Sequence, residues 1–371
     1  MVRAWADVSL AAVGANVVEL RRIATPAALC TVVKADGYGH GAVPVARTAL
    51  AAGAAWLAVA QVAEAVPLRD HGITAPILLL SEPRRDELAD VIAQALEVTA
   101  YSRAMVEHLG RAARSAGTTL PVHLKVDTGM HRVGLAPADV VPVARLVAEH
   151  PALTLRSVWT HCAVADEPDN PVTDRQLTVY EQVLADVAAA GIEVPLRHAA
   201  NSAATIVHPR ARYDLVRCGI SVYGIPPAPG LAGAANLVPA VRLATEVSFV
   251  KEVSAGDGVS YGLRHHFERD TRVATLPIGY ADGVFRRLGL EGQDVLIGGQ
   301  RLPMVGVVTM DQVMVDVGAG SGVERGDEAV LLGTQGDERI TPDEWASRLG
   351  TISYEVVCAI GARVERRYPA S

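Results

Sequence analysis

The sequence is poor in cysteine, in clustered basic residues and in long apolar runs, and each shortage argues against a class of protein. The four cysteines lie far apart and form no C-x-x-C pair, which argues against a zinc knuckle, a thiol redox centre and a disulfide scaffold. No Lys/Arg cluster exceeds a pair and the net charge is -7, so nucleic acid is not the expected partner. The first ten residues hold no apolar signal segment, and no apolar run is long enough to span a bilayer. We therefore expect a cytoplasmic protein with no metal site and no membrane partner.

What the first two thirds of the chain does hold is a regular alternation of strand-like and helix-like stretches. Short runs of apolar and β-branched residues occur at 29–34, 56–60, 76–80, 96–100, 121–127, 155–161, 195–201 and 215–220. Stretches of helical period lie between most of them, for example 42–53 and 176–191, the latter ending on Gly191. Eight strands alternating with helices over roughly 200–250 residues predict a (β/α)₈ barrel over 11–235. An open, doubly wound sheet would alternate in a similar way and stays an alternative.

The pattern changes after a Pro/Gly/Ala-rich stretch at 224–240, which indicates a domain boundary. Strand-like segments separated by Gly/Asp turns follow, so residues 236–371 predict a second, mainly β domain. One helix interrupts it at "TPDEWASRLG", where Thr341 at the N-cap and Glu344 three residues later form a capping box. The fold class is therefore α/β, with a TIM-like barrel followed by a mainly β C-terminal domain.

The stretch "VVKADGYGHGA" allows two cofactor hypotheses. Gly37, Gly39 and Ala42 satisfy G-x-G-x-x-A between a strand and a helix, and Glu64 could hold a ribose, as in dinucleotide-dependent dehydrogenases. A tight turn that needs positive φ at glycine explains the same spacing equally well.

Lys34 raises the second hypothesis. Strand alternation puts Cys30, Val32 and Lys34 on one face, at the C-terminal mouth of the first barrel strand, where barrel active sites lie. A desolvated amine there can bond covalently to an aldehyde cofactor, whereas a lysine that simply reaches solvent is the plainer alternative.

The last two predicted strand ends help to decide between the cofactors. Barrels often bind phosphate at the loops after strands 7 and 8, and these loops carry "NSA" (201–203) and "RCGI" (217–220). A phosphate-bearing aldehyde on Lys34, with its phosphate near Ser202 and Gly219, accounts for all three positions. A dinucleotide would leave Lys34, Ser202 and Arg217 unexplained. The sequence therefore predicts pyridoxal 5'-phosphate.

The chain resembles the alanine racemase family nearly end to end. The segments "VVKADGYGHG", "KVDTGMHRVG", "THCAVAD", "NSA", "VRCGISVYG", "VSYG", "PIGYADG", "TMDQ" and "SYE" follow in the family's order and at its spacing. The resemblance implies interconversion of L- and D-alanine, supplying D-alanine for peptidoglycan. It also implies that residues 1–10 join the second domain, and that a head-to-tail homodimer shares residues between two active sites.

The resemblance also implies roles for individual residues. Lys34 would bind the cofactor and act as one acid–base catalyst, and Tyr261 would be the opposing base, supplied by the other subunit. Arg217 would bind the ring nitrogen of the cofactor. The residues implied to hold the phosphate are Tyr38, Ser202, Gly219, Ile220 and Tyr354.

Four further positions follow from the same resemblance. Arg132 and Met310 match contacts to the substrate carboxylate, and Lys125 matches a lysine that is carbamylated in many members. Thr309 departs from the family, because a cysteine commonly stands before the Met-Asp pair. Tyr354 and Met310 suggest a pocket suited to a methyl side chain, although serine racemases have related sequences.

The chemistry of racemisation explains these residue types. One base on each face of Cα removes and returns a proton without rotation of the intermediate, and both groups need pKa values well below the unperturbed value of about 10. We expect His161 and Arg217 to supply positive charge to Tyr261 through a hydrogen-bond chain, which would lower the pKa of the tyrosine. Arginine does not give up its proton, so the ring nitrogen stays unprotonated and side transamination is suppressed. Two other functions of a pyridoxal-phosphate protein fit these residues less well. A decarboxylase on the same kind of barrel would usually place an acid at the ring nitrogen, where Arg217 is expected. A non-catalytic carrier of the cofactor would leave "VSYG" and "TMDQ" in the second domain without a function.

Overall fold

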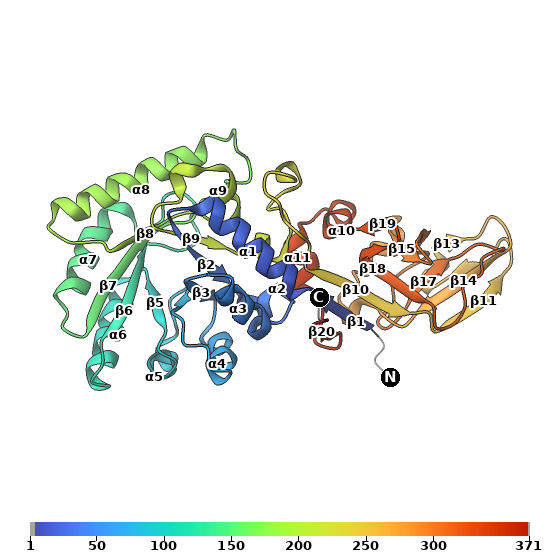
Figure 1. The fold of residues 1–371 in the computed structure, drawn as a ribbon, viewed down its shortest axis with the longest axis horizontal. Helices are drawn as coiled ribbons and strands as arrows, with labels where there is room; N and C mark the ends of the chain where they lie inside the picture. Colours follow the sequence, from blue (N-terminus) through green and yellow to red (C-terminus); the bar gives the residue numbers. More distant parts are fainter. Residues whose placement is uncertain (1–3, 370–371) are drawn as a thin grey trace. The chain divides into compact units, whose positions relative to one another are not determined.

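The computed structural model describes residues 4–369, which form two compact units (Figure 1). The barrel unit comprises residues 12–37 and 42–238, and the β unit comprises residues 4–11, 38–41 and 239–369. Among the helices of these residues, none is long and apolar enough to cross a membrane.

Eight parallel strands build the sheet of the barrel unit. They are β2 Ala28–Val32, β3 Trp56–Val59, β4 Ile77–Leu79, β5 Glu97–Ala100, β6 Leu120–Lys125, β7 Leu153–Trp159, β8 Leu196–His198 and β9 Leu215–Cys218 (Figure 1). Their order, β8-β7-β6-β5-β4-β3-β2-β9, follows the chain, and Arg217 N donates to Ala200 O (3.0 Å) to join β9 to the end of β8. The eight predicted strands and the barrel are confirmed. The open-sheet alternative is wrong, because the strand order never reverses at a switch point.

One helix precedes the first strand of this sheet, and helices or helical turns follow most of the strands (Figure 1). They are α1 Leu10–Ala24, α2 Lys34–Tyr38, α3 Ala42–Ala51, α4 Val62–Asp70, α5 Leu88–Ala93, α6 Arg103–Ser115, α7 Val140–Glu149, α8 Val172–Ala189 and α9 Ser202–Val207. The helices predicted at 42–53 and 176–191 are confirmed as α3 and α8. Gly191 follows α8 with φ 75°, the left-handed conformation in which glycine commonly ends a helix.

The β unit contains one large sheet and two small ones. Its strands are β1 Ala4–Val8, β10 Val241–Glu246, β11 Phe249–Val253, β12 Gly258–Val259, β13 His265–His266, β14 Thr271–Leu276, β15 Asp294–Ile297, β16 Gln300–Pro303, β17 Val313–Asp316, β18 Glu328–Gln335, β19 Glu338–Ile340 and β20 Glu365–Arg367. The large sheet has the order β16-β15-β18-β10-β1-β20, with β19 on β18, while β11-β14-β17 and β12-β13 form the small sheets. Strand β1 pairs antiparallel with β10 and parallel with β20, so residues 4–8 lie inside the large sheet.

Helix α10, Pro342–Leu349, begins at the predicted capping box. Thr341 Oγ1 accepts a hydrogen bond from Glu344 N (3.2 Å), and the Glu344 carboxylate accepts one from Thr341 N (3.4 Å). Helix α11, Ser353–Cys358, follows it directly. The capping box is therefore confirmed, and it fixes the Glu344 carboxylate at the start of α10.

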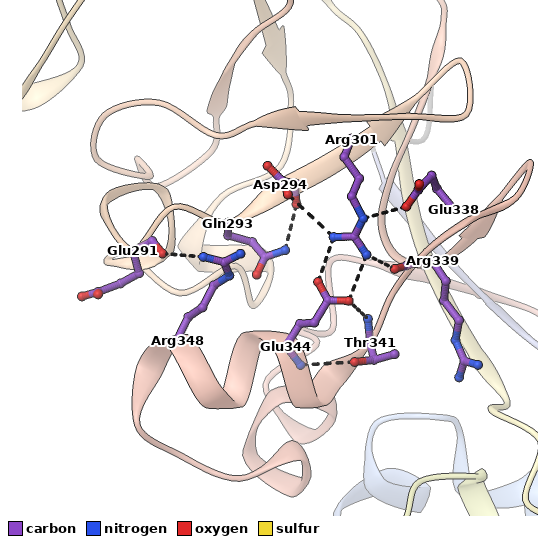
Figure 2. A network of polar contacts seen from close by, with 9 residues as sticks. All are labelled: Glu291, Gln293, Asp294, Arg301, Glu338, Arg339, Thr341, Glu344 and Arg348. Carbon is purple, nitrogen blue, oxygen red and sulfur yellow. Dashed lines mark hydrogen bonds and ion pairs between the residues drawn. The ribbon is translucent and has the colours of Figure 1, made fainter. Parts of the chain in front are cut away.

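The fixed carboxylate of Glu344 belongs to a charged network around Arg301 on β16 (Figure 2). Arg301 donates to both oxygens of Glu344 (2.9 and 3.1 Å) and to Glu338 (2.7 Å), and its Nη1 lies 3.6 Å from Asp294. It also donates to the carbonyl of Arg339. The hydrogen bonds to Glu344 and Glu338 raise the pKa of Arg301 above its ordinary value, so one cation holds three acidic side chains together.

We expect Arg301→Met to lower the free energy of unfolding of the β unit by about 1–2 kcal/mol, because three carboxylates would lose their shared cation. Arg339→Met is the matched control, since its side chain is exposed and makes no ion pair among the described residues. Urea unfolding of both variants measures the difference. Equal stability of the two variants would contradict this account of the network.

Candidate active site

Lys34 is half-buried and stands just after the end of β2, at the start of an unusual turn. Ala35, Asp36 and Gly37 have φ values of 51°, 50° and 61°, so α2 is a left-handed turn. Left-handed backbone costs L-residues roughly 1–2 kcal/mol each. Asp36 Oδ1 offsets part of this cost by accepting from Ala42 N (2.8 Å). Strained backbone of this kind marks functional sites, and here it immediately follows Lys34.

Glu64 on α4 holds the first residue of this turn. One of its carboxylate oxygens accepts from Ala35 N (2.7 Å), and the other accepts from Ala60 N (2.8 Å) and Gln61 N (3.1 Å). With both oxygens committed to backbone, Glu64 is not free to bind a ribose. Gly37 and Gly39 (φ 78°) serve the left-handed turn. The dinucleotide hypothesis is therefore wrong, and the alternative that glycine spacing reflects positive φ is right.

Arg217 on β9 is a buried cation, 3% exposed. Its Nη1 donates to His198 Nδ1 (2.8 Å), and its Nη2 lies within hydrogen-bonding distance of the carbonyls of Thr160 (2.9 Å) and Ala199 (3.0 Å). Its guanidinium stacks 4.5 Å from the centre of the Trp159 ring. Burial lowers the pKa of Arg217 to about 10, so it remains charged near neutral pH. Its Nε–H group has no partner among the described residues and is available to an acceptor.

His161 lies two residues after β7 and accepts from Arg217, with 3.1 Å between Nη2 and His161 Nδ1. Burial, followed by the charge of Arg217, holds the pKa of His161 well below its usual value. The imidazole is therefore neutral. This direction does not support our expectation that His161 itself carries positive charge, because a half-buried ring next to a permanent cation does not easily gain a proton. Arg217 supplies the charge at this point.

Lys125 at the end of β6 is the second buried cation of the barrel unit, 4% exposed. Its Nζ lies 4.7 Å from the centre of the Trp159 ring. Burial, followed by the positive charges of Arg132 and Arg217, lowers the pKa of Lys125 to about 8. Arg132 is exposed in the loop after β6. The mouth of the barrel is thus rich in positive charge, which suits an anionic ligand.

The residues of the barrel unit that were predicted to bind the cofactor phosphate lie close together. Ser202 opens α9 and is buried, and its hydroxyl accepts from Gly219 N (3.0 Å). Ile220 begins a 3₁₀ turn, Ile220–Tyr223, directly after Gly219. A hydroxyl therefore lies beside the exit of β9, as expected for the loops after the last two barrel strands.

The other predicted residues lie in the β unit. Tyr38 is buried and Tyr354 on α11 is half-buried, and their ring centroids are 6.4 Å apart. Tyr261 is 72% exposed and Met310 is 52% exposed. Other residues of the β unit therefore cover only a small part of these two side chains.

The backbone before Tyr261 is strained. Ser260 has φ 64° and ψ −175°, a region that residues other than glycine rarely occupy. Its hydroxyl donates to Val307 O (2.6 Å), which holds the turn in place. The conformation fixes the direction in which the chain presents Tyr261.

Sequence reasoning missed His198 and Trp159, which contact Arg217 from β8 and β7. Their rings stack with centroids 5.4 Å apart and an angle of 10° between planes. A partial signal existed, because both residues fall inside the predicted strands at 155–161 and 195–201, and each proves to be the last residue of its observed strand.

The residues of the barrel unit suit pyridoxal phosphate. Lys34 stands at the mouth of the barrel, and the Nε–H of the buried Arg217, which no residue of 4–369 accepts, is a donor for a ring nitrogen. Ser202 and the surrounding positive charge suit a phosphate. Among the described residues, no group of three or more His, Cys, Asp or Glu side chains is arranged to hold a metal ion.

Comparison with known proteins gives consistent matches along the chain. Residues 8–227 match the family model for the N-terminal domain of alanine racemase, and residues 240–368 match the model for its C-terminal domain. The alanine racemase of Symbiobacterium thermophilum is 51% identical over 364 residues, covering 98% of this chain and 96% of that protein. The alanine racemase of D-cycloserine-producing Streptomyces lavendulae has a crystal structure that matches with a TM-score of 0.95 and 40% identity, covering 100% and 98% of the two chains. The Bacillus anthracis alanine racemase with bound L-Ala-P matches with a TM-score of 0.93 and 35% identity, covering 100% and 96%.

Proposed function

Because this chain belongs to the alanine racemase family, whose members are pyridoxal-phosphate-dependent racemases, we propose that it interconverts L- and D-alanine with two bases. Lys34 acts on one face of the substrate Cα, and Tyr261 of the partner subunit acts on the other. The D-alanine product would serve peptidoglycan synthesis. When bound, the cofactor supplies an electron-withdrawing ring that makes the α-proton of an attached amino acid more acidic.

The observation that carries this proposal is the donor set of Arg217. Its hydrogen bonds are made by Nη1 and Nη2, whereas Nε–H has no partner in the part of the chain that the structure describes. Burial does not discharge this guanidinium near neutral pH. A group that only donates keeps an opposing ring nitrogen unprotonated. This favours proton transfer at Cα with return of the proton, and it argues against a decarboxylase, in which an acid would face the same nitrogen.

Several further residues would hold the cofactor and the substrate. Lys34 would bind the aldehyde carbon, and Arg132 together with the partner subunit's Met310 would contact the substrate carboxylate. The phosphate would be held by Tyr38, Ser202, Gly219, Ile220 and Tyr354. The hydrogen bond between Gly219 N and Ser202 Oγ supports this corner of the site.

The exposure of Tyr261 supports a head-to-tail homodimer with shared active sites. A tyrosine that is 72% exposed and follows a strained residue is presented outward rather than packed within its unit. Met310 is exposed in the same unit, as a contact to a second subunit would require. Each active site would then combine Lys34 of one subunit with Tyr261 of the other.

We expect Tyr261→Phe to lower kcat by about 10²–10³-fold in both directions, because one face of Cα would lose its acid–base group. Cofactor binding should be unchanged, since Lys34 and Arg217 remain. Tyr213→Phe is the matched control, because it removes a hydroxyl that bonds to Glu181 (3.0 Å) in the barrel unit. Full activity of the Tyr261 variant would disprove the assignment.

Lys125 is proposed as a site of carbamylation. Its neutral amine would add to carbon dioxide, forming an N–C bond and releasing one proton, and the resulting anion could hold Arg132. The lowered pKa of about 8 supports this, because the neutral fraction of the amine rises as the pH passes upward through that value. An ordinary lysine would reach the same fraction only near pH 10.

We therefore expect a carbamate signal in ¹³C NMR of protein equilibrated with ¹³C-bicarbonate, stronger at about pH 8 than at about pH 6. Lys125→Ala should remove the signal, and Lys251→Ala, which changes an exposed lysine of β11, should keep it. A signal that survives in the Lys125 variant would assign the carbamate elsewhere.

One experiment tests the proposed function directly. Alanine labelled with deuterium at Cα is racemised in ordinary water, and the product is analysed for retained deuterium. With two bases, the group that removes deuterium from one face is not the group that protonates the other face. The proton that is added then comes from solvent, and the product should carry almost no deuterium. A single base would return part of the deuterium to the product. Borohydride treatment of the holoenzyme should then fix the cofactor on Lys34 rather than on Lys125 or Lys251.

A further inference from the structure

A polar layer crosses the interior of the barrel, where branched apolar side chains usually dominate. Five neighbouring strands, β5 to β9, each contribute one member: Glu97, His123, Ser157, His198 and Arg217. His123, Ser157 and His198 are fully buried, and Glu97 is 9% exposed. The register places β5 to β8 side by side in this order, and backbone hydrogen bonds join β9 to β8. The layer therefore follows the wall of the barrel from one strand to the next.

Hydrogen bonds link each member of the layer to the next. Arg217 Nη1 lies 2.8 Å from His198 Nδ1, and His198 Nε2 lies 2.9 Å from Ser157 Oγ. Ser157 Oγ lies 2.7 Å from His123 Nδ1, and His123 Nε2 lies 2.8 Å from Glu97 Oε2. The four distances are those of good hydrogen bonds, and the chain they form is unbroken.

The two ends of this chain fix its direction. A guanidinium can only donate and a carboxylate can only accept. His198 must therefore accept at Nδ1 and donate from Nε2–H to Ser157. Ser157 in turn donates to His123 Nδ1, and His123 donates from Nε2–H to Glu97. No member can reverse its role without leaving two donors or two acceptors face to face.

The charges along the chain agree with this direction. Burial lowers the pKa of both His198 and His123, so the two rings are neutral. Burial alone would raise the pKa of Glu97, but the hydrogen bond from His123 and that from Trp56 Nε1 (3.0 Å) outweigh it, and the pKa is lowered. The chain thus runs from a cation through three neutral groups to an anion.

Arg217 has no carboxylate among its hydrogen-bond partners in the described residues, which are two carbonyls and two imidazole nitrogens. Glu97 is the acid to which it is linked. Arg156 also lies near this carboxylate, with its Nε 3.9 Å from Glu97 Oε1, a longer separation than a hydrogen bond. The close contacts of Glu97 are therefore with His123 and Trp56.

We propose that Glu97 is a positioning residue for Arg217, acting through the one-way chain of His123, Ser157 and His198. This hydrogen-bond chain commits Nη1 of Arg217 to His198, so the Nε–H group stays directed to a hydrogen-bond acceptor bound in the active site. This inference rests on the proposed function, since that acceptor is the ring nitrogen of pyridoxal phosphate. It assigns a role to a carboxylate four hydrogen bonds away from the guanidinium.

The first test uses the apoprotein and needs no activity. Protein labelled with ¹⁵N in histidine should show two buried, neutral rings with Nε2 protonated and Nδ1 bare. Ser157→Ala should remove the acceptor of His198 and the donor to His123, and both rings should shift. Thr99→Val is the matched control, because Thr99 is a buried hydroxyl on β5 that lacks a hydrogen-bond partner among the described residues. A bare Nε2 on either ring of the wild-type protein would overturn the proposal.

The second test compares two ligands on reconstituted protein by equilibrium dialysis. Pyridoxal 5'-phosphate carries the ring nitrogen, and 1-deazapyridoxal 5'-phosphate replaces it with carbon. Wild-type protein should prefer the first ligand by about tenfold. Ser157→Ala should lose most of this preference, Glu97→Gln should lose about threefold of it because the amide oxygen still accepts from His123 while the charge is gone, and Thr99→Val should keep it.

The outcomes separate the possible failures. If the variants weaken both ligands equally, or neither, Glu97 does not act through Arg217 and the inference is overturned while the proposed function stands. If wild-type protein binds neither ligand and borohydride fixes nothing on Lys34, the proposed function fails and takes the inference with it.

Discussion

Lys34→Ala is expected to abolish racemisation, with kcat/KM falling by at least about 10⁴-fold in both directions. The variant removes two roles at once, because the same amine holds the cofactor aldehyde and serves one face of Cα. Lys34 is well placed for both, since a left-handed turn tied down by Glu64 fixes the backbone directly after it. The measurement is the rate of D-alanine formation from L-alanine, and of the reverse reaction, with purified protein.

Lys251→Ala provides the matched control for this variant, because Lys251 is an exposed lysine of the β unit. It should retain full activity and the yellow colour of the cofactor-loaded protein. The Lys34 variant should lose the colour that survives dialysis, while its circular dichroism and thermal unfolding stay close to those of the wild type. Stereo-inversion at an unchanged rate in Lys34→Ala would remove the basis of the proposed mechanism.

The architecture was accessible from the sequence because its signals are local. Most barrel strands appear as short apolar or β-branched runs, and Gly191 and the Thr341–Glu344 capping box mark helix ends through backbone chemistry that a few residues determine. Strand ends were less well predicted. Strand β2 stops at Val32 rather than at Lys34, because the left-handed turn begins immediately afterwards and depends on Glu64, thirty residues further along the chain.

The candidate site was predictable where a residue type alone implies a role, as for Lys34 and Arg217. It was not predictable where the role depends on surroundings. His161 was expected to carry charge, but its half-buried position beside Arg217 lowers its pKa. These surroundings arise only when the ends of β7 and β9 are brought close together in the barrel. The hydrogen-bond chain from Glu97 to Arg217 could not be predicted for the same reason. Its members are far apart in sequence and are brought together by the register of the barrel strands.

Arg217→Glu is expected to lower kcat/KM for racemisation by at least about 10³-fold and to raise the pyruvate formed per racemisation event. The new side chain would carry a proton that a ring nitrogen could take, and a protonated ring favours transamination. In that reaction the amino group of alanine passes to the cofactor, and hydrolysis releases pyruvate. The carboxyl group would also face the carbonyls of Thr160 and Ala199, so it should be held in its protonated form.

Arg217→Lys distinguishes this electronic role from a packing role. A lysine lacks the planar fork of donors and should also slow racemisation, but it donates without accepting and should not increase pyruvate formation. Both variants lose the hydrogen bonds that now hold His198, Thr160 and Ala199, so thermal unfolding must accompany the rates. If the glutamate variant folds, binds the cofactor and yields no more pyruvate per turnover than the lysine variant, Arg217 serves only to position the ring, and its inability to give up a proton has no part in reaction specificity.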